Sequence, residues 1–183
     1  MKKIISKKIK NSINTVPDFP KKGIMFRDIT SLIKNTRVFK IVIDEIIQIA
    51  KQKKINKIVG IDSRGFIFAA PIAYKMNIPL ILVRKKGKLP SSSYKVKYAL
   101  EYGFDILEIN KDSINKTDRV MVIDDLIATG GTALATSKLI SKSSSKKINF
   151  IFVIELEDLP GVSKIKKLGH AVKTLCSFKE EER

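Results

Sequence analysis

Residues 119–132, RVMVIDDLIATGGT, contain the features that decide the fold. Their run of four apolar residues, 120–123, predicts a parallel strand that is buried on both faces. Two carboxylates, Asp124 and Asp125, follow at the point where we expect the strand to end. The loop 128–132 then leads into a helical pattern, so this stretch predicts a strand, a loop and a helix in succession.

The loop between this strand and this helix has the properties of an anion site. The first N–H groups of a helix lack partners within it, and the positive end of the helix dipole points toward the loop. Gly130 and Gly131 let the backbone approach a ligand closely, and Thr129 and Thr132 add hydroxyl donors. Because the preceding carboxylates are acceptors for sugar hydroxyls, we predict a ligand with both a phosphate and a polyol, a phosphorylated sugar.

Two other phosphate-binding motifs are missing from the sequence. GxxxxGK[ST] does not occur, which excludes a nucleoside-triphosphate P-loop, and GxGxxG does not follow a predicted strand, so a dinucleotide site has no support. Taken separately, the acid pair is also compatible with a helix cap or turn, and the two glycines with a plain loop. The order of strand, acid pair and glycine loop is what makes the signal specific.

The formal net charge of +18 raises nucleic acid as a partner. However, only six of the 36 cationic residues are Arg, and the Lys residues are scattered rather than clustered with aromatics. The sequence contains no DNA- or RNA-reading motif, and a genome biased toward A·T codons would enrich Lys, Ile and Asn together. We therefore do not expect specific nucleic-acid binding, while the positive field is compatible with an anionic substrate.

Length and cysteine content predict a single domain of 183 residues in a reducing compartment. Cys176 is the only cysteine, so no intramolecular disulfide can form, and we expect a cytoplasmic protein. No apolar run approaches about 18 residues, so we expect no membrane span. The N-terminal segment is basic but lacks the continuous apolar stretch of a signal peptide.

Strand-like and helix-like segments alternate along the chain, which predicts an α/β fold with a mostly parallel, twisted sheet flanked by helices. The predicted strands are 57–62, 80–83, 103–109, 120–123, 148–154 and 171–177. The predicted helices are 36–51, 66–76, 133–141 and 158–168, after a short amphipathic first helix marked by Ile4, Ile5, Ile9 and Ile13. Asp62, Arg84 and Asp124 each end a predicted strand, so we expect them around one crevice.

Two segments are predicted to be irregular. Residues 16–30 contain Pro17, Pro20 and Gly23, which break any helix, so we expect a loop. Residues 86–101 are too long and polar for a packed connection, which is typical of a lid or a disordered segment. His170 has no evident partner in the sequence and is expected to be structural, and no Cys/His set indicates a metal site.

The succession of strand, acid pair and glycine loop resembles the phosphoribosyl-pyrophosphate signature of the type I phosphoribosyltransferases. In that family the adjacent acids, here Asp124 and Asp125, hold the ribose hydroxyls, and the loop, here 128–132, holds the 5′-phosphate. Hypoxanthine-guanine members usually have an Asp at the position of Ala128, and orotate members tend to have Thr. In this respect the chain resembles the adenine branch.

A second segment, DSRGF at 62–66, resembles the short pyrophosphate-binding loop of that branch. Arg64 has a planar guanidinium that suits phosphate oxygens, although alone it is equally compatible with a surface position after a turn. Some relatives have Glu-Ala where this chain has Asp62 and Ser63. The family can hold a non-proline cis peptide here, which sequence alone does not reveal.

Arg84 and Lys88 belong to a basic run that follows a predicted strand. Without the resemblance, such a run is compatible with a solvated turn. Beside a phosphate crevice, its charge would neutralise a departing pyrophosphate. In the family the Arg often reaches the site of the neighbouring subunit, so the resemblance implies a homodimer.

The motif LEYG at 100–103 also matches the family, in which its Glu approaches N7 of the purine and exchanges a proton. The resemblance therefore implies a catalytic Glu101 and a lid residue Tyr102. Without it, Glu101 is simply a carboxylate at a strand edge. The lid interior at 91–97 departs from relatives that contain acids there.

Residues 17–28 resemble the family's base-binding hood. A flat base needs an apolar slot and a few hydrogen bonds to its edge. The resemblance implies that backbone groups near Met25 and Arg27 bind adenine and that Phe26 supports them by packing. The alternative is a rigid, Pro-rich surface segment whose aromatic residues belong to the core.

The resemblance implies that adenine and phosphoribosyl pyrophosphate react to give AMP and pyrophosphate in purine salvage, and we expect an oxocarbenium-like transition state as in other glycosyl transfers. Glu101 and Arg64 are the expected catalytic residues. Mg²⁺ is expected to arrive with the substrate rather than to be held directly by the protein. Within the single domain, we assign 1–35 to the first helix and hood, 36–183 to the α/β core and about 85–101 to the lid.

Two alternatives stay open. One is a type I enzyme for xanthine, hypoxanthine-guanine or orotate, which Ala128 and the hood disfavour. The other is a regulator that senses phosphoribosyl pyrophosphate and binds nucleic acid through its positive surface, which the intact LEYG motif disfavours.

Overall fold

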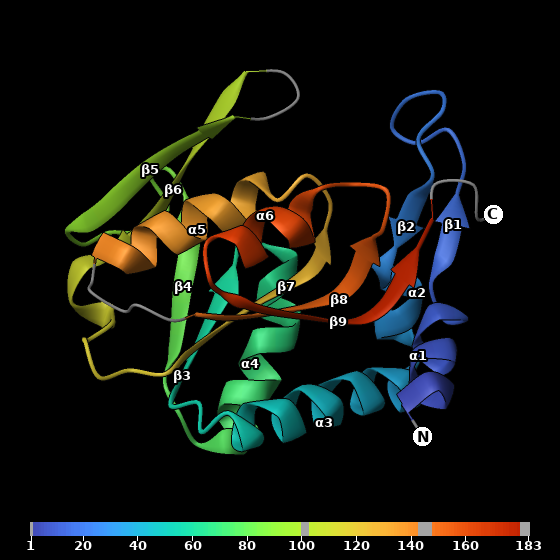
Figure 1. The fold of residues 1–183 in the computed structure, drawn as a ribbon, viewed down its shortest axis with the longest axis horizontal. Coiled ribbons are helices and arrows are strands. Elements are labelled where there is room, and N and C mark those ends of the chain that lie inside the picture. The colour runs from blue at the N-terminus through green and yellow to red at the C-terminus, as the bar shows by residue number, and fades with distance from the viewer. Residues whose placement is uncertain (1, 100–102, 143–147, 180–183) are drawn as a thin grey trace.

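The computed structural model describes residues 2–99, 103–142 and 148–179, which form an α/β fold around a seven-stranded sheet (Figure 1). The strand order is β5-β6-β4-β3-β7-β8-β9. The parallel strands are β3 (Lys57–Ile61), β4 (Leu80–Lys85), β7 (Val120–Ile127), β8 (Asn149–Leu156) and β9 (Ala171–Phe178). The strands β5 (Ser93–Ala99) and β6 (Phe104–Asn110) are antiparallel. The predicted fold class is confirmed.

Helices pack on both faces of this sheet and divide its core into two clusters (Figure 1). One face carries α1 (Lys2–Lys10), α2 (Ile29–Lys34), α3 (Thr36–Gln52) and α4 (Arg64–Met76), and the other carries α5 (Gly131–Lys142) and α6 (Gly161–Lys167). In β7, Met121 and Ile123 belong to the first cluster, whereas Val120 and Val122 belong to the second. Because successive side chains of a strand point to opposite faces, a strand covered on both sides is apolar at every position.

The N-terminal segment is more regular than its prolines indicate. The prediction of a loop over 16–30 is wrong at both ends of this range. There β1 (Asn14–Val16) pairs with β2 (Phe26–Asp28), and α2 begins directly after β2. The Asp28 carboxylate caps α2 by accepting a hydrogen bond from the Thr30 N–H at 2.9 Å. In the first helix, Ile9 is fully buried as expected, but Ile4 is 64% exposed.

The segment predicted to be irregular at 86–101 is a strand over 93–99. The strand β5 pairs with β6 along its whole length and packs against α5. Tyr94, Val96 and Tyr98 are half-buried, whereas Lys95 and Lys97 between them are exposed. This period of two is a strand pattern, which the strand-depleted Lys residues obscured.

Three smaller boundaries also differ from the sequence prediction. The strand β7 continues four residues beyond 123, α4 begins at Arg64, and α6 begins after Pro160 rather than around it. His170 has a partner after all, because its Nε2 lies 2.7 Å from the Ser137 hydroxyl. Burial lowers the pKa of His170, so this contact holds a neutral ring between α5 and β9.

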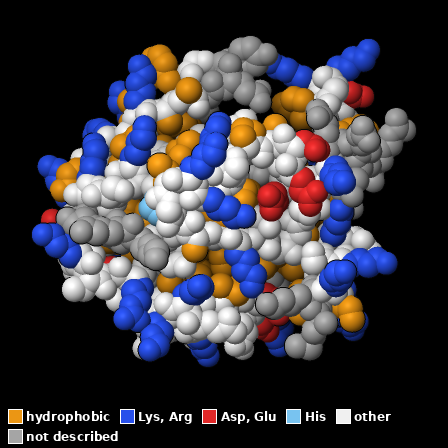
Figure 2. Space-filling view, viewed as in Figure 1, with side chains coloured by type: hydrophobic (Ala, Val, Ile, Leu, Met, Phe, Trp, Pro, Cys, Tyr) orange, Lys and Arg blue, Asp and Glu red, His pale blue; other side chains and the backbone are white. Residues whose placement is uncertain are grey.

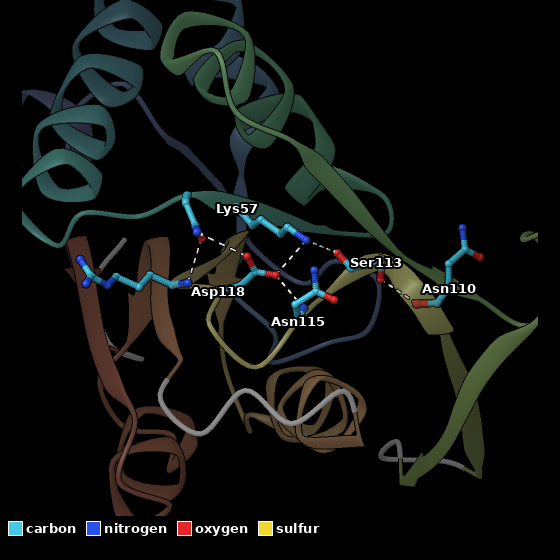
Figure 3. A network of polar contacts seen from close by, with 7 residues as sticks. Lys57, Asn110, Ser113, Asn115 and Asp118 are labelled. Atoms are coloured by element: carbon cyan, nitrogen blue, oxygen red, sulfur yellow. Dashed lines mark hydrogen bonds and ion pairs between the residues drawn. The ribbon is translucent and has the colours of Figure 1, made fainter.

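A polar network joins the amino-terminal ends of β3 and β7 (Figure 3). Lys57 Nζ lies 2.8 Å from Asp118 Oδ2 and donates a hydrogen bond to the Ser113 carbonyl at 2.8 Å. The Asn115 N–H also donates to Asp118 Oδ2, and Ser113 donates its hydroxyl proton to the Asn110 carbonyl. Only 8% of the Asp118 side chain is exposed, so this carboxylate anchors the loop at the end of the sheet opposite the strand carboxyl ends.

We predict that Asp118→Ala lowers the free energy of unfolding by about 2–3 kcal/mol, because it leaves a largely buried Lys57 without its counterion. Burial raises the pKa of Asp118, but the bonds from Lys57, Asn115 and Asn56 outweigh it and the pKa is lowered. The stabilisation is therefore present above the ordinary pKa near 4 and should disappear as the pH falls below it.

Urea unfolding of the wild type and the variant at pH 7 and pH 3 measures this effect. The matched control is Asp44→Ala, which removes the pair with Lys75 at 3.0 Å, where both side chains are almost half exposed. The control should cost less than about 1 kcal/mol. Equal losses for the two variants would contradict the prediction.

The surface is basic without a single concentrated patch on the face that Figure 2 shows, where Lys and Arg side chains spread over most elements. No helix within the described ranges is long and apolar enough to cross a membrane.

Candidate active site

A pocket of about 360 Å³ lies at the carboxyl ends of β3 and β7, where the sequence predicted a crevice. It brings together the acid pair, the glycine loop and the loop after β3. The residues that line it are Asp62, Ser63, Arg64, Lys85, Tyr98, Ala99, Asp124, Asp125, Leu126, Ile127, Ala128, Thr129, Gly130, Gly131, Thr132, Ala133 and Phe152. The predicted juxtaposition of acids and loop is confirmed.

The glycine loop spans residues 128–130, between the end of β7 and the start of α5. The first helical hydrogen bond runs from the Leu134 N–H to the Gly130 carbonyl at 2.9 Å. The N–H groups before Leu134 therefore donate to no carbonyl of the helix. They are available at the loop, where the positive end of the helix dipole also lies. This is the geometry expected of a phosphate-binding loop.

Gly130 is packed backbone to backbone against Gly161, the first residue of α6. Gly130 has a φ of 82°, which favours glycine, and a Cβ on it would lie 2.8 Å from the Gly161 Cα. A Cβ on Gly161 would lie 2.3 Å from the Ala128 carbonyl oxygen. The Gly161 N–H donates to that same oxygen at 2.9 Å, and Lys164 Nζ donates to the Thr129 carbonyl at 3.2 Å. These contacts from the start of α6 therefore fix the position of the glycine loop.

The two carboxylates lie within β7 rather than after it, which corrects the expected end of the strand. Asp125 is buried, and its Oδ2 lies 3.1 Å from Arg64 Nε. Asp124 is half-buried, and its Oδ1 accepts a hydrogen bond from the Asp125 N–H at 2.9 Å. Burial, and then the neighbouring Asp125 charge, raise the pKa of Asp124 well above its ordinary value.

The loop after β3 approaches β7 closely. The peptide bond between Asp62 and Ser63 is cis, the conformation that sequence alone could not reveal. A Cβ on Gly65 would lie 2.6 Å from the Ile123 carbonyl oxygen, so only glycine lets α4 begin this near to the acid pair. Arg64, the first residue of α4, reaches Asp125 as a result.

Neither Arg84 nor Lys88 is among the residues that line the pocket, and Arg84 lies within β4, which continues two residues beyond the predicted strand end at 83. Arg84 Nε is 3.2 Å from Asp62 Oδ2, and Arg84 also donates to the Lys88 carbonyl at 3.3 Å. Lys88 is exposed on the following turn. Lys85, which the sequence analysis did not select, lines the pocket instead.

The side chains of the three predicted base-binding residues lie at three different places. Phe26 lies next to the pocket, because the Arg64 guanidinium is 5.9 Å from its ring centroid. Arg27 points away: its side chain is buried, donates to Thr15 and to the Lys179 carbonyl, and stacks over the Phe178 ring at 4.3 Å. Met25 lines a separate hollow in the hood. The backbone contacts with the base near Met25 and Arg27 stay a prediction, whereas the Arg27 side chain joins β2 to the end of β9.

The remaining predicted residues, Glu101 and Tyr102, lie outside the described residues. Sequence reasoning missed several contributors to the site, among them Lys85, Tyr98, Phe152 and Gly161. Lys85 belongs to the basic run, but nothing marks it within that run. The signal for Tyr98 was the alternation over 93–99, and Gly161 after Pro160 was an available sign of a close contact.

Comparison with known proteins agrees with this geometry. The phosphoribosyl transferase domain family matches residues 29–177. The adenine phosphoribosyltransferases of Nitrosomonas eutropha and Pelagibacter ubique are both 49% identical over 170 residues, which is 93% of this chain and 98% and 97% of theirs. The chain therefore belongs to the phosphoribosyltransferase family of glycosyl-transferring enzymes, and within it to the adenine phosphoribosyltransferase branch.

Solved structures of that branch share the fold. The Saccharomyces cerevisiae adenine phosphoribosyltransferase, complexed with an imino-altritol bisphosphate and adenine, superimposes with a TM-score of 0.88 at 36% identity. It covers 94% of this chain and 99% of its own. The Thermoanaerobacter pseudethanolicus enzyme has a TM-score of 0.86 at 40% identity, with 94% and 99% covered. The family resemblance inferred from the sequence is confirmed.

We predict that Gly161→Ala displaces the glycine loop, because the added Cβ would lie 2.3 Å from the Ala128 carbonyl oxygen and 3.0 Å from the Gly130 nitrogen, which are both main-chain atoms of that loop. The affinity for ribose 5-phosphate, measured by calorimetry, should fall on the order of tenfold or more. Overpacking should also cost about 1–3 kcal/mol of stability. Ser163→Ala in the same helix is the control, since its exposed hydroxyl bonds only to the Pro160 carbonyl. A wild-type affinity for Gly161→Ala would show that α6 does not hold the loop.

We also predict that Asp124→Asn raises the melting temperature at pH 7 by a few degrees. The substitution keeps the acceptor for the Asp125 N–H and removes a charge that burial and Asp125 disfavour. Because the folded pKa is raised, ionisation costs stability as the pH rises through it, and the difference should vanish below about pH 4, where both states are protonated.

Thermal melts of both proteins from pH 3.5 to 8 measure this effect. The control is Asp112→Asn, which replaces an exposed Asp in the short helical turn Lys111–Ser113 after β6. This change should leave the melting temperature unchanged. A lower melting temperature for Asp124→Asn at pH 7 would contradict the argument.

Proposed function

We propose that this chain transfers the phosphoribosyl group of phosphoribosyl pyrophosphate to adenine, giving AMP and pyrophosphate in purine salvage. The observation that supports it most is one pocket lined by both an acid pair and a glycine loop at a helix start. Such a pocket can hold a sugar by its hydroxyls and its phosphate together. The base is suggested by the relatives, which are named as adenine enzymes.

In this proposal the ribose 5-phosphate lies along the end of β7. Asp124 and Asp125 accept hydrogen bonds from the two ribose hydroxyls. Residues 129–132 bind the 5′-phosphate through N–H groups and the hydroxyls of Thr129 and Thr132. Sugar hydroxyls that donate to Asp124 would favour its ionised form, which the protein alone disfavours.

We assign the pyrophosphate to the loop that follows β3. Asp62 and Ser63 would offer polar groups at this end, and Arg64 and Lys85 line the pocket as cations. Arg84 and Lys88 lie just beyond it, where their charge adds to the positive field. Mg²⁺ enters as part of the substrate, because it prefers phosphate oxygens, waters and few carboxylates as ligands.

The reaction breaks the bond between C1 of the ribose and the pyrophosphate oxygen, and N9 of adenine bonds to C1. Charge that grows on the leaving pyrophosphate is offset by Arg64, Lys85 and the bound Mg²⁺. One ring proton of adenine must be lost as N9 bonds to C1, and Glu101, which the family resemblance assigns near N7, is the proposed group that takes this proton. Since the β5–β6 hairpin forms one wall of the pocket, it would exclude water from the cation-like sugar.

Adenine is assigned to the space between the pocket and the hood. Phe26 beside Arg64 supplies an apolar surface there. Tyr102 is proposed as the lid residue that closes over the site. Backbone groups near Met25 and Arg27 remain the proposed donors and acceptors for the edge of the base.

Homodimer formation and a cytoplasmic location are proposed as well. The outer face of α4 leaves Tyr74 86% exposed and Ile67 38% exposed, and such apolar side chains favour contact with a second copy. A single buried Cys176, whose pKa burial raises to about 12, suits a reducing compartment.

The experiment that tests the function is a base panel with phosphoribosyl pyrophosphate and Mg²⁺. We expect kcat/KM for adenine to exceed that for hypoxanthine, guanine, xanthine or orotate by about 100-fold or more, because a site that hydrogen-bonds one base leaves its groups unpaired with another. Preference for a different base would overturn the adenine assignment. Salt-dependent DNA binding without turnover would favour the regulator instead.

The same assay tests the ribose contacts. The double variant Asp124→Asn and Asp125→Asn should weaken the affinity for phosphoribosyl pyrophosphate by about 100-fold, because two charged acceptors are lost. The pair Asp44→Asn and Asp112→Asn, both remote from the pocket, is the control for lost negative charge. Unchanged affinity in the first double variant would remove the acids from substrate binding.

A further inference from the structure

The carboxyl end of β5, in the β5–β6 hairpin, contacts the first residue of α5, which directly follows the glycine loop. A Cβ on Gly131, the first residue of that helix, would lie 3.2 Å from the Ala99 carbonyl oxygen and 3.7 Å from the Tyr98 ring. Tyr98 and Ala99 also line the pocket. The end of β5 therefore forms a wall directly over the N–H groups where the 5′-phosphate is proposed to bind.

The Tyr98 side chain connects both walls of the pocket. The side chains of Thr132 in the first turn of α5 and of Asp105 in β6 both lie near enough to the Tyr98 hydroxyl to influence its pKa. Asp105 is the cross-strand partner of Tyr98 and pairs with Lys85 Nζ at 3.6 Å. The Asp105 carboxylate thus lies between two side chains that line the pocket, those of Lys85 and Tyr98, and Tyr98 lies next to a third, that of Thr132.

The hydroxyl is in the right protonation state to donate a hydrogen bond. Burial, and then the Asp105 charge, raise the pKa of Tyr98, although the contact with Thr132 opposes this. The phenol therefore stays neutral at physiological pH and has one proton to donate. In the free protein this donor faces Asp105, whose charge Lys85 partly offsets.

We propose that Tyr98 is a substrate-contacting residue whose hydroxyl donates a hydrogen bond to the 5′-phosphate of the bound sugar. This inference rests on the proposed function and adds a phosphate ligand from outside the glycine loop. The phosphate oxygen replaces Asp105 as the acceptor, and the Lys85 ammonium limits the repulsion between Asp105 and the phosphate. Binding of the sugar phosphate thereby ties the hairpin to α5.

Tyr94 provides a matched comparison on the same strand. It lies four residues before Tyr98 and therefore on the same face, and it is half-buried like Tyr98. Its ring lies 5.7 Å and 6.0 Å from the ammonium groups of Lys111 and Lys142, and it is not among the residues that line the pocket. Loss of its hydroxyl tests general effects on the hairpin without touching the phosphate.

The experiment compares Tyr98→Phe and Tyr94→Phe with the wild type. Phe keeps the ring against Gly131, so both variants should fold with wild-type melting temperatures. For Tyr98→Phe we expect the Kd of ribose 5-phosphate and the KM of phosphoribosyl pyrophosphate to rise about 10- to 150-fold, as for one hydrogen bond to a charged group. The KM of adenine should stay within about twofold, and Tyr94→Phe should match the wild type throughout.

Each outcome separates this inference from the proposed function. If Tyr98→Phe binds ribose 5-phosphate as tightly as the wild type does, the phosphate contact is wrong. If the KM of adenine rises as much as that of phosphoribosyl pyrophosphate, the hydroxyl acts on the hairpin as a whole, and the contact is again wrong. If the wild type makes no AMP but binds ribose 5-phosphate in a Tyr98-dependent way, the proposed function fails and the contact stands.

Discussion

The close main-chain packing around the carboxyl end of β7 is the constraint on which the site depends. A Cβ on Gly65 would lie 2.6 Å from the Ile123 carbonyl, and one on Gly161 would lie 2.3 Å from the Ala128 carbonyl. These two contacts seat α4 and α6 against opposite ends of the segment that contains the acid pair and the glycine loop. Because side chains larger than hydrogen would separate the backbones, glycine at these positions sets the shape of the pocket.

The charges of the pocket are balanced within the protein itself. Asp125 is paired with Arg64, and Asp62 is paired with Arg84, whereas Asp124 is held in a position that disfavours its charge. A phosphorylated sugar would exchange these internal partners for hydroxyl donors and phosphate oxygens. In the proposed function, the disfavoured charge of Asp124 costs the free protein some stability and supplies an acceptor for the ligand, as is typical of functional sites.

The sequence was most informative where the signal was local. The strand at 120–123, the helix at 36–52 and the glycine loop each have a pattern within a short window, and each is in place. The prediction failed over 93–99, where Lys residues between half-buried Tyr94, Val96 and Tyr98 masked a strand that only its pairing with β6 stabilises. It also ended β7 too early, because Asp is depleted in strands, while β8 continues alongside to Glu155.

The local pattern was enough to predict the fold class, the glycine loop and the acid pair, because the strand, the loop and the helix start follow each other within fourteen residues and the strand and helix have different periodicities. Which other residues join them depends on the folded chain. Lys85, Tyr98 and Gly161 come from distant strands and helices, and the local signs at Tyr98 and Gly161 do not reveal that these residues meet at one site. Their place is set by the register of the sheet and by how closely neighbouring backbones approach, which are long-range properties that no short stretch of sequence encodes.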